Sequence, residues 1–67
     1  GGGLAHDAGT VYATTGYGEL VAVDAATGGV RWRQRVDAPI GGAPTVANGV
    51  VYVVGRDATG WAVQETR

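Results

Sequence analysis

The sequence contains no cysteine, no serine, no lysine and no methionine, and its single histidine is His6. Without cysteine, disulfide bonds are excluded as a source of stability. The absence of serine and cysteine also removes the two commonest side-chain nucleophiles. One histidine makes a histidine-based metal site within one chain unexpected. The missing initiator methionine favours a processed product or an excised segment.

Charge and apolar runs are equally limited. The formal net charge is −1 and all the cationic residues are arginines, so no basic excess indicates a nucleic-acid partner. No apolar run approaches the roughly 18 residues that a membrane-spanning helix needs. With 67 residues the chain is one short domain at most. A chain of this size buries only about 60% of its unfolded surface, which places it near the limit of independent stability.

What the sequence does contain is an internal repeat of 40 residues, with no gap needed in the alignment. The matching segments are Gly1-Gly2 with Gly41-Gly42, Gly9 with Gly49, Val11-Tyr12 with Val51-Tyr52, and Ala22-Val23 with Ala62-Val63. A period of about 40 residues built from short β-segments is typical of the blades of a β-propeller. We therefore divide the chain into a complete blade, residues 1–40, and a partial blade, residues 41–67.

Short segments rich in Val, Tyr, Thr and Trp lie between closely spaced glycines and prolines, a pattern that predicts strands joined by tight turns. The predicted strands are Leu4–Asp7, Thr10–Thr15, Glu19–Asp24, Val30–Val36, Ala43–Ala47, Val50–Gly55 and Trp61–Glu65. Asn48-Gly49 is a strong hairpin signal because both residues tolerate positive φ. The run Val50–Val54 is continuously apolar, which predicts a strand covered on both faces rather than a helix segment. The prolines at 39 and 44 suit the crossing from an outer to an inner strand.

Residues 22–32 carry a motif with four spaced positions: Ala22, Asp24, Gly28 and Trp32. Its spacing resembles the tryptophan-docking motif of the PQQ-like propeller family. That family includes quinoprotein dehydrogenases and the propeller subunit of the outer-membrane β-barrel assembly machinery. The resemblance extends upstream through the Val11-Tyr12 strand and the turn at residues 16–20. The Gly-His and Trp-Asp dipeptides of the other propeller family with a similar period are absent.

The mechanics of this motif are structural rather than catalytic. Asp24, at the end of a strand, is placed to accept hydrogen bonds from turn amides, and Gly28 permits the left-handed conformation that reverses the chain. The resemblance implies that Trp32 packs against the second repeat and donates its indole N–H to a neighbouring main chain. In the second repeat Gln64 replaces the motif's Asp, so this repeat departs from the motif at the turn. Trp61 aligns with Val21 and is expected to fill core space or cover a blade face.

Other candidate sites have plainer alternatives. Arg31, Arg33 and Arg35 alternate along a strand and so project from one face, where they could bind an anion. The favoured alternative is that they lie on an exposed edge strand, where their charges discourage edge-to-edge pairing. His6, near the end of an inner strand, could meet a ligand, but a partly solvated strand end is favoured. Nothing singles out a catalytic or calcium-binding set among the carboxylates Asp7, Glu19, Asp24, Asp37, Asp57 and Glu65. The glycine clusters lack the strand–loop–helix context of a phosphate-binding loop.

The sequence therefore predicts an all-β fold: one complete four-stranded antiparallel blade plus three strands of a second, with its outer strand missing. Exposed blade faces indicate part of a larger ring of about six to eight blades, or several copies assembled into one. The expected partners are neighbouring blades or other copies, and a protein ligand, with no nucleic acid and no membrane span.

The leading functional prediction is a non-enzymatic scaffold or protein-interaction surface, with no catalytic, cofactor or metal residues. The alternative is a fragment of a quinoprotein dehydrogenase that binds PQQ and calcium; a third interpretation is an engineered or excised blade unit. The resemblance implies a secreted, periplasmic or extracellular parent.

Overall fold

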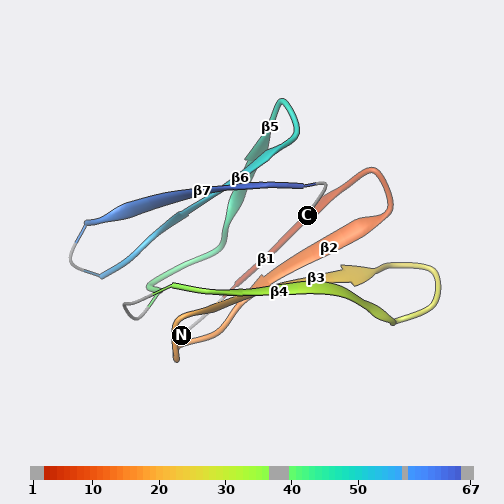
Figure 1. Ribbon diagram of the computed structural model, residues 1–67, viewed down its shortest axis with the longest axis horizontal. Helices are drawn as coiled ribbons and strands as arrows, with labels where there is room; N and C mark the ends of the chain where they lie inside the picture. The colour runs from red at the N-terminus through yellow and green to blue at the C-terminus, as the bar shows by residue number, and fades with distance from the viewer. Residues whose placement is uncertain (1–2, 37–39, 57, 66–67) are drawn as a thin grey trace.

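The computed structural model describes residues 3–36, 40–56 and 58–65. It confirms the predicted all-β fold, with every described strand antiparallel to its neighbours (Figure 1). The strands are β1 (Gly3–Asp7), β2 (Thr10–Thr14), β3 (Glu19–Asp24), β4 (Val30–Arg35), β5 (Thr45–Ala47), β6 (Val50–Val54) and β7 (Gly60–Gln64).

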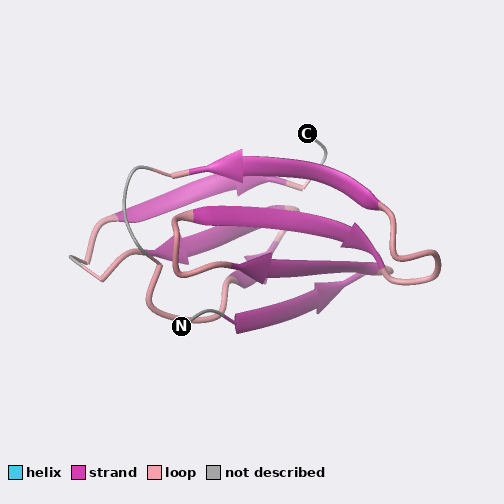
Figure 2. Ribbon diagram, turned by 90° about the horizontal axis from the view of Figure 1, so that it is seen from below, coloured by secondary structure: helices cyan, strands magenta, loops and turns pink. Residues whose placement is uncertain are grey.

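The strands form two sheets, ordered β1-β2-β3-β4 and β5-β6-β7. In both sheets each strand pairs with the next one along the chain, so each is a meander of successive hairpins. The two sheets lie one over the other, as the view in Figure 2 shows. This arrangement of a four-stranded and a three-stranded antiparallel sheet is that of a propeller fragment.

The 40-residue repeat is visible in the turns. The hydrogen bonds that recur at this offset are Thr15 N to Glu19 O (2.9 Å) with Gly55 N to Thr59 O (2.8 Å), and Ala25 N to Gly9 O (2.9 Å) with Glu65 N to Gly49 O (2.9 Å). Positive φ angles recur as well: Ala8 (49°) corresponds to Asn48 (52°), and Gly9 (81°) to Gly49 (76°). Two successive residues at positive φ are what a two-residue hairpin turn requires. The two repeats therefore share their backbone conformation as well as their sequence pattern.

Strand boundaries differ from the predicted ones by one or two residues, for local reasons. β2 ends at Thr14 because Thr15 already belongs to the turn, where its carbonyl accepts a hydrogen bond from Gly18 N at 3.2 Å. β5 begins two residues later than predicted, after Pro44, whose nitrogen has no proton to donate to a ladder. Gly55, predicted to end β6, lies outside it in an isolated bridge with Ile40.

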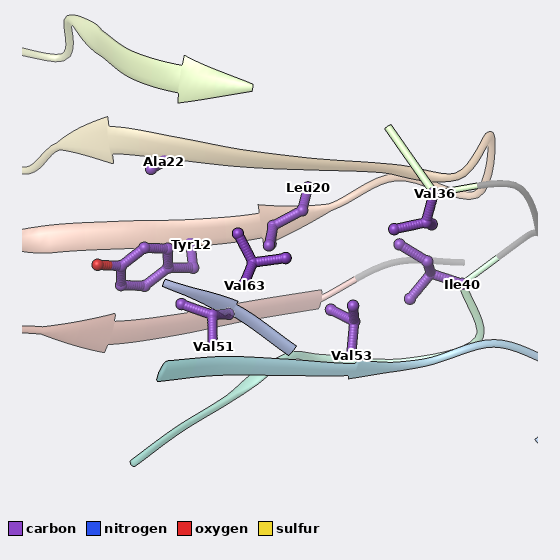
Figure 3. Packing of buried hydrophobic residues seen from close by; sticks show 8 residues of the cluster. All are labelled: Tyr12, Leu20, Ala22, Val36, Ile40, Val51, Val53 and Val63. Atoms are coloured by element: carbon purple, nitrogen blue, oxygen red, sulfur yellow. The ribbon is translucent and has the colours of Figure 1, made fainter. Parts of the chain in front are cut away.

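The hydrophobic core fills the space between the sheets (Figure 3). It combines side chains of both sheets with two from the connection between them. Its buried members are Tyr12, Leu20, Ala22, Val36, Ile40, Val51, Val53 and Val63, and Trp32, Val46 and Trp61 pack against it. Trp61 thus contributes to the core, one of its two predicted roles. Because the core comes from both repeats, burial of apolar surface holds the two sheets together.

The start of β1 and the end of β2 contact the segment that leads into β5. Thr14, buried in β2, donates its hydroxyl to the Gly42 carbonyl at 2.8 Å and accepts a hydrogen bond from Gly3 N at 3.0 Å. A Cβ at residue 3 would lie 2.6 Å from Ala43 Cα, closer than side chains tolerate. Glycine at position 3 therefore allows the start of β1 to contact the segment that leads into β5.

Each sheet buries one face and leaves the other open. In β6, Val51 and Val53 are buried, whereas Tyr52 and Val54 are 45% and 58% exposed. The predicted cover on both faces requires a neighbouring sheet on each side, and within the described residues the first sheet covers one face of β6. The open face of the first sheet likewise carries Leu4, which is 68% exposed.

Some sequence-based expectations fall on residues outside the described part of the chain. These are the Gly1-Gly2 match, Asp37, Pro39, and Asp57 at the start of the predicted turn at residues 57–60.

Candidate docking interface

Trp32 lies at the outer edge of the first sheet, on the face turned toward the second. In register, β4 places Trp32 opposite Ala22, which is opposite Tyr12 and then Ala5 on the inner strand. Cross-strand neighbours share a face, so these four side chains form one row across the sheet. The Tyr12 and Trp32 rings are tilted by 45° with centroids 5.9 Å apart, within the range of favourable aromatic contact. Ala22 between them is fully buried.

Both aromatic side chains reach the same residue of the second repeat, Glu65, which follows β7. The indole Nε1–H of Trp32 donates to the Glu65 carbonyl at 3.1 Å. The hydroxyl of Tyr12 donates to Glu65 Oε1 at 2.5 Å. Glu65 is in turn held by its own amide, which donates to Gly49 O at 2.9 Å. One residue directly after the last strand of the second sheet therefore accepts two hydrogen bonds from the first sheet.

The environment of Tyr12 is low in water and close to negative charge. Its side chain is only 2% exposed. Burial, the hydrogen bond to Glu65 and the charge of that carboxylate together raise the pKa of Tyr12 to about 12. The phenol therefore stays protonated and acts as a donor across the interface.

This pKa predicts a loss of stability in alkaline solution. Between the ordinary tyrosine value of 10.0 and about 12, the unfolded chain loses the Tyr12 proton while the folded chain keeps it. The free energy of unfolding should be insensitive to Tyr12 below this window and fall as the pH rises through it. Urea unfolding at successive pH values would measure the slope. Tyr12→Phe should flatten it, and an equal slope in that variant would contradict the assignment.

The turn after β3 has the geometry that the motif residues suggested. Oδ1 of Asp24 accepts hydrogen bonds from the amides of Ala26 at 2.8 Å and Thr27 at 3.2 Å. These two amides, and then the guanidinium of Arg31, hold the pKa of the Asp24 carboxyl below its usual value. Gly28 has a φ of 78°, in the left-handed region, and donates its amide to Asp24 O at 2.8 Å.

The structure brings Ala22 and Trp32 together and places Asp24 and Gly28 in the turn that joins their strands. Sequence reasoning missed Tyr12 and Glu65. Tyr12 carried a signal, because Val-Tyr recurs at residues 11–12 and 51–52. Glu65 carried none, since it aligns with Ala25, whose side chain has no acceptor.

The arginines of β4 lie on an edge strand and two of them are paired. Arg33 forms an ion pair with Glu19 at 3.3 Å, and Arg31 forms one with Asp24 at 3.1 Å. Arg31 lies beside a register shift between β3 and β4, which interrupts the alternation of side chains along β4. Solvent screening weakens exposed pairs of this kind. These pairs support the edge-strand interpretation over an anion site. His6 is exposed on β1.

Within residues 3–36, 40–56 and 58–65, no three His, Asp or Glu side chains are grouped so that they could hold a metal ion. The same part of the chain contains no helix with the length and apolar character to cross a membrane.

The chain consists of two antiparallel meanders that repeat at an offset of 40 residues and share one core. This architecture defines it as a unit of β-propeller repeats. Its family is shown by sequence: the chain belongs to the PQQ-like repeat family whose model is described as outer membrane protein assembly factor BamB, and that model matches residues 1–67. The predicted family is thereby confirmed. A comparison with curated proteins gives no match.

Proposed function

We propose that this chain is a non-enzymatic propeller segment that serves as a scaffold or protein-interaction surface of a larger protein. The observation that carries the proposal is that the motif and its neighbours are used in packing sheet against sheet. Trp32 and Tyr12 of the first sheet both bond to Glu65 beyond the second. The description of the family, an assembly factor, supports the same role.

In this proposal Ala22, Asp24, Gly28 and Trp32 form a tryptophan-docking unit. Asp24 and Gly28 shape the turn between β3 and β4, and Ala22 leaves room beside the ring of Trp32. The indole then bonds to a main-chain carbonyl, which every residue type offers. Such a unit joins one sheet to the next without requiring a particular side chain in the partner, as a repeat architecture needs.

Both sheets expose apolar side chains on their open faces. Leu4 on the first sheet and Tyr52 and Val54 on the second are apolar and exposed. Faces of this kind mark interaction surfaces in soluble proteins. Neighbouring blades, or other copies of the chain, would cover them.

A cross-linking experiment on the protein that contains this chain tests the scaffold proposal. A photoreactive amino acid at Tyr52 is expected to cross-link to another β-sheet segment of the same protein or of a second copy. The matched control is Tyr17, a turn residue that is 92% exposed and lies outside both sheet faces. Absence of any sheet cross-link from position 52 would contradict the proposal.

The same protein allows the alternative, a quinoprotein dehydrogenase, to be tested directly. PQQ and Ca²⁺ are added, and dye-linked oxidation of alcohols and sugars is measured beside an authentic quinoprotein dehydrogenase. A scaffold should show no PQQ-dependent dye reduction. Activity that requires both PQQ and Ca²⁺ would overturn the non-enzymatic proposal.

A further inference from the structure

The two hydrogen bonds to Glu65 differ in what they demand of the partner residue. Trp32 bonds to a backbone carbonyl, so its hydrogen bond is available whatever side chain stands at position 65. Tyr12 bonds to Oε1 of the side chain, so its hydrogen bond depends on a side-chain acceptor at that position. The first bond therefore requires only a main-chain carbonyl in the partner, whereas the second requires an acceptor in the partner's side chain.

The position that carries this carboxylate is structurally constant but chemically variable. Glu65 and Ala25 both follow the third strand of their repeat, and their amides donate to Gly49 O and Gly9 O at the same distance of 2.9 Å. Only Glu65 has an acceptor in its side chain. The backbone hydrogen bond is therefore the same with alanine or glutamate at this position, and only the side-chain acceptor differs.

The second sheet presents the same hydroxyl on its open face. Tyr52 corresponds to Tyr12 at the 40-residue offset, and it lies opposite Ala62 in register as Tyr12 lies opposite Ala22. Tyr12 is 2% exposed beneath the second sheet, whereas Tyr52 is 45% exposed. The open face of the second sheet thus repeats the face that the first sheet buries, without its partner.

We propose that Tyr52 selects, as the next unit packed on this face, a β-sheet unit of the same family that carries a glutamate immediately after its third strand. The inference rests on the proposed scaffold function. A phenol that becomes buried without an acceptor loses its hydrogen bonds to water, so a unit with an apolar residue at this position is disfavoured. A carboxylate acceptor forms the stronger, charge-assisted bond.

The chain itself supplies the probe for a test. Residue 25 of a second copy is equivalent to residue 65, and in the natural sequence it is an exposed alanine. Ala25→Glu gives the first sheet of one copy an acceptor for Tyr52 of another. Since hydrogen bonds to charged groups contribute about 1.5–3 kcal/mol, self-association should tighten about tenfold to a hundredfold. Sedimentation equilibrium measures this on the full 67-residue chain.

Matched variants separate the hydrogen bond from other effects. Ala25→Gln, with the same length and no charge, should give a smaller gain than Ala25→Glu. Tyr52→Phe added to Ala25→Glu should abolish the gain. Circular dichroism of each variant verifies that its β-structure is retained.

The inference is overturned if Ala25→Glu associates no more tightly than the natural chain, or if the gain survives in the Tyr52→Phe background. Such a result leaves the scaffold proposal standing where position 52 still cross-links to a neighbouring sheet. Loss of that cross-link is the separate failure of the proposed function.

Discussion

Replacing Trp32 with alanine is expected to lower the free energy of unfolding by about 3 kcal/mol. This value is at the lower end of the range for truncation of large aromatic side chains, because the Trp32 ring is only partly buried. The substitution removes the contact with Tyr12 and the hydrogen bond to the Glu65 carbonyl together. A chain of this length has roughly 3–10 kcal/mol of stability in total. The loss therefore threatens the fold itself, and urea unfolding followed by circular dichroism would measure it.

Two controls separate the contributions of Trp32. Trp32→Phe keeps an aromatic ring beside Tyr12 and loses the indole donor, so it should lower the free energy of unfolding less than Trp32→Ala does. Loss of the hydrogen bond should account for about 1 kcal/mol of the decrease. Tyr17→Ala, at a residue 92% exposed, should change stability by no more than about 0.5 kcal/mol. A loss of that small size in Trp32→Ala would show that the indole does not join the sheets.

Leu20→Ala should destabilise the chain by about 2–5 kcal/mol, since it leaves a cavity in the middle of the shared core. Leu20 is fully buried in β3, between the sheets (Figure 3). The same substitution at Leu4, 68% exposed on the opposite face, is the matched control and should cost no more than about 0.5 kcal/mol. Denaturation midpoints of the two variants, measured side by side, give the comparison.

Equal losses at the two leucines would contradict the placement of the core. The Leu4 control also bears on the open face of the first sheet. In the chain alone the Leu4 side chain contacts water, so its truncation should lower the free energy of unfolding only slightly. In a larger assembly where a neighbouring sheet covers this face, the same variant should become costly, because a buried leucine then loses its contacts.

Most strands were predictable because their signals are local. Alternating or continuous runs of β-branched residues between glycines indicate a strand whatever surrounds them. Asn48-Gly49 predicts a hairpin because both residues tolerate the positive φ angles of its turn. Boundaries were less predictable. A strand ends where its hydrogen bonds to the neighbouring strand stop, as at Pro44 and Thr15. The position of the neighbouring strand determines this point as much as the propensity of the residues does.

The exposure of β6 depends on how many sheets pack around it. The composition of Val50–Val54 suits burial on both faces, but composition cannot say how many neighbours are present. Among the described residues, Val51 and Val53 are buried between the sheets, whereas Tyr52 and Val54 are 45% and 58% exposed.

By itself, the sequence determined the all-β class, the 40-residue repeat, the turn at Asp24 and Gly28, and the prominence of Trp32, because each follows from residue types close together in the chain. Only the tertiary structure showed that Glu65 accepts from both Trp32 and Tyr12. Those bonds join residues 33 and 53 positions apart. The acceptor of the first is a carbonyl that all residues share, and the acceptor of the second is a side chain outside every repeated pattern. Such pairings arise when two sheets pack, and no local preference encodes them.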